Sequence, residues 1–279
     1  MKSEPKPIRK PSVAGMFYPE NGASLEKTVI QYLESATEPI ITLKRLFGII
    51  SPHAGFVASG PVAAVGYRFL KRHPFSKVVV IAPSHHEYFR GISIFSGKAY
   101  QTPMGEVPVD QKICDLLTKR GGVVYRSVKG HQAEHAIEVQ LPFLQNIFPE
   151  FSLIPVVIGT VTLNEIDEFA FILAEVFAKT EFIVVASSDL SHYHSYPEAV
   201  QMDKHLISLL EKMNLSALES GYKDNSLEAC GLAPILTLLK YAKVLGNSRC
   251  KALDYRNSGD TVGLSDQVVG YLSAAVFEL

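Results

Sequence analysis

The 279-residue sequence lacks several features that would assign it to a particular class of protein. It contains no tryptophan and only three cysteines, Cys114, Cys230 and Cys250. This number is too small for a disulfide framework, and their spacing is not that of a zinc knuckle. Because free thiols are typical of a reducing compartment, we expect a cytoplasmic protein. Residues 1–15 have no apolar centre, so no signal peptide is predicted there.

An excess of one charge and a long apolar run are also missing. The chain carries 27 basic and 28 acidic residues, which gives a formal net charge of −1 and no global field to hold nucleic acid. No run approaches the roughly 18 apolar residues that a membrane span needs. We therefore expect a small molecule or a peptide as partner, and neither nucleic acid nor membrane. The densest basic stretch, Lys2 to Lys10, is interrupted by proline, which predicts a flexible, solvated tail over residues 1–10.

The sequence does contain the alternation of elements that is typical of an α/β protein. Hydrophobic residues make up 47% of the chain, enough for a core of good size. Short β-rich runs alternate with amphipathic stretches, and no linker interrupts them, which predicts one domain. Strands are expected over residues 46–50, 78–81, 92–95, 153–158, 182–186, 251–255 and 268–277. Helices are expected over residues 59–70, 109–120, 166–177, 197–213 and 232–245, and Pro142 must kink or begin another. Thr162 and Glu165 form a T-x-x-E capping box ahead of the run 166–177.

Histidine and aspartate side chains follow three of these expected strands. His53 follows the strand ending at residue 50, and His85 follows the strand ending at residue 81. Asp189 and His192 follow the strand ending at residue 186. Because ligands bind beyond the carboxyl ends of strands in an open α/β sheet, we expect these side chains to converge. A lone histidine is more often a structural hydrogen-bonding residue, and this is our interpretation of His73, His194 and His205.

Cys230 directly precedes the helix expected over residues 232–245. The helix dipole there would favour the thiolate that metal binding or nucleophilic attack requires. Cys114 lies inside an expected helix and Cys250 opens an expected strand, so both are predicted to be core thiols. Imidazole with thiolate or carboxylate is the usual ligand set for zinc, iron or copper. The sequence therefore predicts a metal or small-molecule site built from His53, His85, Asp189, His192 and Cys230.

Ordered motifs along the chain resemble those of the Memo family, whose microbial members are called AmmeMemoRadiSam system protein B. The motifs are SPHAGF, IAPSHH, TPMGEVPVD, EHAIEVQLPFLQ, VVASSDLSH, EACG and YRNSGD. The family is similar in fold to the class III extradiol dioxygenases, which hold non-haem iron(II). The resemblance implies a single Memo-like domain over residues 1–279, with a central mixed, largely parallel sheet flanked by helices. The family label also implies a functional link to a radical-SAM protein.

The resemblance implies metal-binding roles for His53, His85 and Cys230. Cys230 stands where the dioxygenases use a carboxylate ligand, and its softer sulfur favours copper, zinc or a redox role. Iron(II) or copper is therefore the expected cofactor, with zinc as a further possibility.

The resemblance also implies catalytic roles for two residues of the SSD-x-x-H segment. Asp189 is the first of them, and His192 corresponds to the acid/base histidine of the dioxygenases. His86, His135 and Glu138 fall within the motifs without an assigned role.

Three functions stay open on the sequence alone. In the first, the site is a metalloenzyme with redox chemistry in which His192 moves protons. In the second, the same cleft binds a metal, a peptide or a small ligand without turnover. In the third, Cys230 is a covalent nucleophile activated by His53 or His192.

Overall fold

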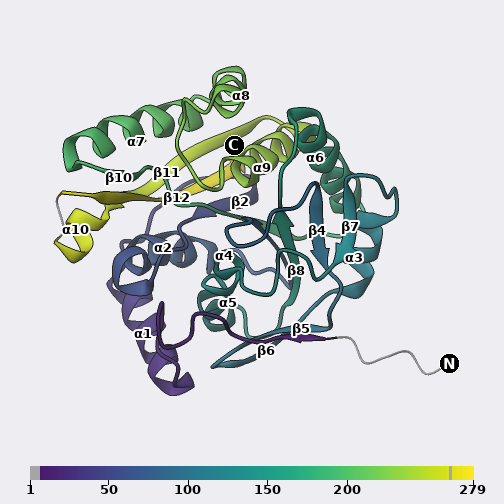
Figure 1. The fold of residues 1–279 in the computed structure, drawn as a ribbon, viewed down its shortest axis with the longest axis horizontal. Coiled ribbons are helices and arrows are strands. Elements are labelled where there is room, and N and C mark those ends of the chain that lie inside the picture. Colours follow the sequence, from purple (N-terminus) through teal and green to yellow (C-terminus); the bar gives the residue numbers. More distant parts are fainter. Residues whose placement is uncertain (1–6, 264–265) are drawn as a thin grey trace.

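The computed structural model describes residues 7–263 and 266–279, and its centre is a block of parallel strands (Figure 1). Four strands lie side by side in the order β2 (Arg45–Ser51), β9 (Ile183–Ser187), β3 (Lys77–Pro83) and β8 (Ser152–Ile158). They are apolar on both faces, and in β3 the run Val78 to Ala82 is fully buried. Such continuous apolar runs are typical of parallel strands that are covered by helices on both sides.

Antiparallel pairings complete the nine-stranded sheet at both ends. On one side β12 (Val268–Glu278) pairs with β2, and both β11 (Ser248–Asn257) and β10 (His192–His194) pair with β12. On the other side β4 (Ile92–Phe95) runs antiparallel to β8 and parallel to β7 (Val124–Ser127). The predicted fold class is therefore confirmed: one α/β domain with a mixed sheet whose centre is parallel.

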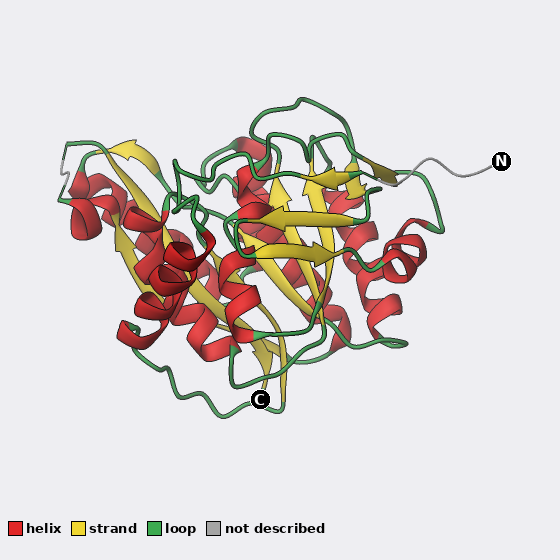
Figure 2. Ribbon diagram, turned by 90° about the horizontal axis from the view of Figure 1, so that it is seen from below, coloured by secondary structure: helices red, strands yellow, loops and turns green. Residues whose placement is uncertain are grey.

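Helices cover both faces of this sheet, as the two ribbon views show (Figures 1 and 2). On β2, Gly48 faces Leu238 of α9 (Leu232–Leu245), whereas the next residue, Ile49, faces Gly66 of α2 (Phe56–Leu70). Because successive residues of a strand point to opposite faces, α9 and α2 lie on opposite sides of the sheet.

The remaining helices extend these two layers. The helix α6 (Leu163–Phe177) packs beside α9, and α1 (Gly22–Ser35), α5 (Leu141–Ile147) and α10 (Ser258–Val262) pack on α2. The other helices are α3 (Gln111–Thr118), α4 (His135–Glu138), α7 (Tyr196–Glu211) and α8 (Leu215–Asp224). None of the helices in the described ranges has the length and apolarity required to span a bilayer.

Two helix starts agree with the sequence and one does not. Thr162 and Glu165 form the capping box of α6, and Pro142 lies in the first turn of the new helix α5. The start predicted at residue 59 is wrong, because α2 already begins at Phe56. Ser59 lies inside that helix, where its hydroxyl donates to the Ala54 carbonyl at 2.8 Å.

A small second sheet brings the N-terminal segment onto the body of the protein. It joins β1 (Ile8–Arg9), β5 (Ala99–Thr102) and β6 (Gly105–Pro108). The flexible tail predicted for residues 1–10 is therefore wrong at residues 8–9, and residues 1–6 lie outside the described part. Arg9 is only 1% exposed, because its guanidinium is paired with the buried carboxylate of Glu138. The prolines and basic residues of this segment did not indicate that Arg9 would pair with Glu138.

Candidate metal centre

The carboxyl ends of β2, β9 and β3 lie level with one another at the centre of the sheet. Ser51 at the end of β2 is in register with Ser187 at the end of β9, and Ala186 of β9 pairs with Ile81 of β3. Two residues beyond the last residue of each strand stand His53, Asp189 and His85, respectively. The adjacency of these three strands is what brings side chains together that are far apart in sequence.

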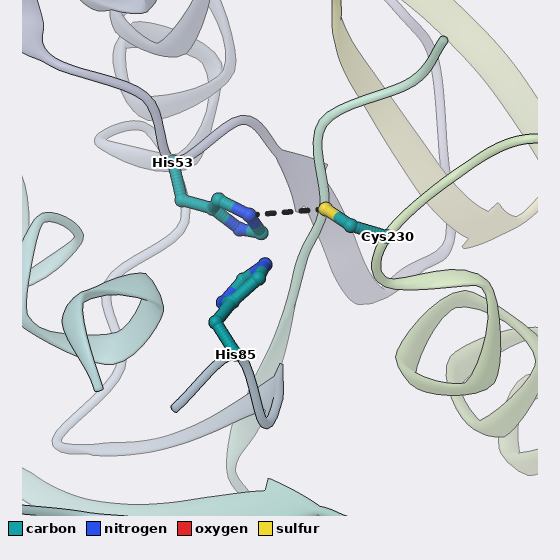
Figure 3. Close-up of side chains that lie close together, drawn as sticks. All are labelled: His53, His85 and Cys230. Atoms are coloured by element: carbon teal, nitrogen blue, oxygen red, sulfur yellow. Dashed lines mark hydrogen bonds between the residues drawn. The ribbon is translucent and has the colours of Figure 1, made fainter. Parts of the chain in front are cut away.

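His53, His85 and Cys230 point toward one another (Figure 3). One ligand atom from each residue lies within 4.8 Å of the other two, and Sγ of Cys230 is 3.1 Å from Nε2 of His53. Bonds of about 2.0–2.3 Å to a zinc-sized ion would place the ligand atoms roughly 3–4 Å apart. A movement of the side chains by about 1 Å would bring the three ligand atoms to that spacing. The three residues predicted as metal ligands therefore have both the chemistry and the spacing for an ion.

The ring of His53 is held through Nδ1, the nitrogen that does not face Cys230. Nδ1 lies 2.9 Å from Oγ of Ser187, which leaves Nε2 facing Cys230. His53 is 2% exposed, and burial together with the neighbouring His85 lowers its pKa to about 3. The imidazole is thus neutral at ordinary pH, which is the form that binds a metal.

The ring of His85 is held by a carboxylate that the sequence analysis missed. Its Nδ1 lies 2.9 Å from Oε1 of Glu134, and its backbone N–H donates to Oε2 at 2.7 Å. Burial opposes the charged form of His85, but the hydrogen bond and charge of Glu134 prevail and raise the pKa of His85. Burial likewise opposes the charge on Glu134, yet its hydrogen bonds with His85 and Ala136 lower its pKa to about 2. A histidine ligand whose second nitrogen meets a carboxylate is a common arrangement in metal sites.

Glu134 and His135 form a second group of possible ligands with His85, again within 4.8 Å. However, both oxygens of Glu134 already accept backbone N–H groups, from His85 and from Ala136, and Nδ1 of His85 faces one of them. Glu134 therefore supports both the ring and the backbone of His85. His135 stacks on His85 with ring centroids 4.8 Å apart, and burial with the charge of His53 lowers its pKa to about 4. His86 lies beyond His135 on the exposed rim, 5.7 Å between ring centroids.

Of the two residues predicted to be catalytic, Asp189 contacts this group of three directly, and His192 is close enough for its charge to act on His53. Oδ1 of Asp189 accepts the backbone N–H of His53 at 2.7 Å, and its own N–H lies 3.3 Å from Sγ of Cys230. Burial raises the pKa of Asp189. Nδ1 of His192 is 2.8 Å from the Leu190 carbonyl, and because a carbonyl only accepts, Nδ1 carries the proton of the neutral ring. Nε2 of His192 is then the nitrogen able to take up a proton.

The sulfur of Cys230 does not have the lowered pKa that its place before a helix predicted. Burial and the charge of Asp189 raise the pKa of the Cys230 thiol. Removal from water and the nearby carboxylate both favour the neutral thiol over the thiolate. That part of the sequence prediction is wrong.

Glu138 and the isolated histidines lie outside the centre itself. Glu138 is paired with Arg9 and accepts the Tyr18 hydroxyl, so it has a structural role. His194 pairs with Glu228 at 2.9 Å, and Cys114 and Cys250 are buried as predicted.

A cavity of about 280 Å³ borders the centre on the side of Cys230. The loops that follow β3 and β8 and the segment between α8 and α9 form its walls. Glu87, Thr160, Tyr222 and Asn225 give it a largely polar lining. Cys230 lines this cavity, so a small polar molecule can lie beside that residue.

Comparisons with known proteins agree with the resemblance seen in the sequence. The family described as "Memo-like protein" matches residues 9–275. A "MEMO1 family protein" of Aquifex aeolicus is 36% identical over 266 residues, covering 95% of this chain and 97% of the relative. Another of Methanobrevibacter smithii is 33% identical over 277 residues, covering 95% and 98%. In fold, the chain is similar to the crystal structure of protein JW3007 from Escherichia coli K12, with a TM-score of 0.57, 15% identity, and coverage of 83% of this chain and 99% of the other.

Proposed function

This chain belongs to the Memo family, and we propose that it binds iron(II) or copper through His53, His85 and Cys230 and uses the ion in redox chemistry on a small molecule. One observation carries the proposal. Both imidazoles keep Nδ1 engaged with a protein acceptor, so both have Nε2 left for the side of Cys230. Such an arrangement fixes ligand rings before an ion arrives.

The donor set fits a transition metal and not a hard cation. Two imidazoles and one sulfur suit copper, zinc and iron, whereas magnesium and calcium prefer oxygen ligands. Three protein ligands would also leave positions on the ion for a substrate or an oxidant, as in catalytic sites. When bound, a redox-active ion would supply electron transfer and polarisation of a coordinated group.

The protein's own groups have distinct tasks in this proposal. His192 accepts or returns a proton at Nε2, because its Nδ1–H is held by Leu190. Asp189 positions two ligand segments through the His53 N–H and the Cys230 sulfur. The cavity beside Cys230 receives the small molecule.

Metal analysis of protein purified without oxygen tests this function. We expect near-stoichiometric iron or copper in the unsubstituted chain, and loss of the metal in His53→Ala and Cys230→Ser. His194→Ala is the matched control, because that histidine pairs with Glu228 outside the ligand set. Equal metal content in all four proteins, or none in the unsubstituted chain, would refute a site at these residues.

Non-catalytic binding of a metal or ligand is the alternative, and His192 separates it from an enzyme. The loaded protein is screened for consumption of oxygen or peroxide with candidate small molecules. A turnover that disappears in His192→Ala with full metal content supports the enzyme. Full metal content without turnover in any protein supports the binding role. A covalent role for Cys230 is disfavoured by its raised pKa, since the thiolate is the nucleophile.

A further inference from the structure

We propose that Ser187 and Gln140 are positioning residues that fix the tautomer of His53, with the proton on Nδ1 and the lone pair of Nε2 directed at the metal position. The tautomer follows from hydrogen bonds within the protein, whereas its effect on metal binding rests on the proposed function. It goes beyond the ligand set, because neither residue contacts the ion.

Ser187 has a single hydroxyl proton, and its neighbours decide where that proton goes. Its Oγ lies 2.7 Å from the carbonyl oxygen of Ala136, which can only accept a hydrogen bond. The hydroxyl proton of Ser187 therefore points at Ala136. Oγ then has only lone pairs to offer to its other two neighbours, Nε2 of Gln140 and Nδ1 of His53, each 2.9 Å away.

The orientation of the Gln140 amide is fixed in the same way. Its Nε2 lies 2.9 Å from the Pro52 carbonyl, and its Oε1 lies 2.7 Å from the Tyr67 hydroxyl. Turning the amide over would place two acceptors against each other at Pro52, so Nε2 is the donor there and toward Ser187. Both amide protons of Gln140 are thereby used, and Ser187 can only be an acceptor for Gln140.

Nδ1 of His53 must then be the donor in its bond to Ser187. Ser187, Gln140 and Tyr67 are at most 1% exposed, so no exchange with bulk water offers an alternative partner. The opposite tautomer would leave two lone pairs facing each other in a buried site, which is costly. Nε2 of His53 is consequently an acceptor for the thiol proton of Cys230, and an ion would take the place of that proton.

Nitrogen NMR of metal-free protein with ¹⁵N-labelled histidine tests the tautomer directly. The His53 signals are identified by their loss in His53→Ala. We expect Nδ1 of His53 to be the protonated nitrogen in the unsubstituted chain. A protonated Nε2, or a mixture of tautomers, would overturn the proposal, and this measurement requires no folded Ser187 variant.

Zinc affinity measured by competition with a chelator tests the consequence. In Ser187→Ala we expect a mixed tautomer and an affinity lower by about 10–100-fold, and in Ser187→Thr a return toward the unsubstituted value. Ser93→Ala is the matched control, since Ser93 is a fully buried serine in β4 whose hydroxyl has no partner among the described residues. Unchanged tautomer and zinc affinity in Ser187→Ala would refute the positioning role. Failure of the unsubstituted chain to bind zinc, iron or copper would refute the proposed function and leave the tautomer assignment standing.

Discussion

Nδ1 of His85 lies 2.9 Å from Oε1 of Glu134, and the same carboxylate accepts the backbone N–H of His85 at 2.7 Å. Ring and backbone of one candidate ligand are thus held by one buried side chain. His53 is held differently, with the neutral hydroxyl of Ser187 on its ring and Asp189 on its backbone. The two histidines therefore differ in basicity, although both present Nε2 to the centre.

Glu134→Gln should weaken the centre, because it removes the charge beside His85 and places an amide NH2 against one of the two backbone N–H groups that the carboxylate accepts. The amide keeps an oxygen for His85 but removes the negative charge, so we expect the pKa of His85 to fall below its value in the unsubstituted chain. Metal affinity should fall by about 10–100-fold. NMR titration of His85 and a chelator competition measure the two effects. The control is Glu228→Gln, which removes the same charge beside His194; equal effects of both substitutions would contradict the role of Glu134.

Metal affinity should rise with pH, and the raised pKa values give the sign. Cys230 and His85 both have raised pKa values, so each holds its proton to higher pH than usual. An ion must displace the Cys230 proton throughout the neutral range, and the His85 proton as well when the pH falls below the pKa of His85. Each displaced proton changes the apparent affinity by about tenfold per pH unit. Chelator competition between mildly acidic and mildly alkaline pH checks this, and an affinity independent of pH would contradict it.

The sequence could predict the candidate centre because its parts follow the ends of buried strands. His53, His85 and Asp189 stand just beyond three runs of apolar, β-branched residues, and parallel strands bring such ends to one edge of a sheet. The order of the strands, with β9 between β2 and β3, could not be predicted from the pattern of apolar residues. It depends on long-range pairing that no single segment encodes.

What the sequence did not reveal are the residues that act through other residues. Glu134 is a charged residue in a loop, and nothing local indicates that it is buried against His85. Arg9 lies in a basic, proline-rich stretch that is typical of a tail, and its partner Glu138 is far away in the chain. The prediction of a thiolate at Cys230 was wrong for a similar reason. The sequence shows that Cys230 precedes a helix, but it does not show that the thiol is buried or that Asp189 lies beside it.

Cys230→Asp should change the metal that the site prefers. A carboxylate at residue 230 would give the two-histidine, one-carboxylate set that is typical of non-haem iron(II), in place of a softer sulfur donor. We expect the copper-to-iron ratio of the purified protein to fall, whereas Cys230→Ser should lower both metals. Metal analysis of the three proteins grown with both ions decides the matter. An unchanged ratio in Cys230→Asp would show that residue 230 does not bind the ion.

Arg9→Met should destabilise the protein strongly although it lies near the N-terminus. Arg9 forms a fully buried ion pair with Glu138, and its Nε also donates to the His131 carbonyl at 3.0 Å. Methionine keeps much of the volume but leaves the Glu138 charge without a counter-charge. We expect a loss of about 3–5 kcal/mol in the free energy of unfolding, measured by urea denaturation.

Lys10→Met is the matched control for this loss, because Lys10 is exposed and its side chain bonds that of Gln101 at 2.6 Å. Its effect should stay within about 0.5 kcal/mol. Adding Glu138→Gln to Arg9→Met removes the unpaired charge, so the double variant should lose less than the sum of the two single losses. If Arg9→Met cost no more than Lys10→Met, the buried ion pair of Arg9 with Glu138 would contribute nothing to the stability of the protein.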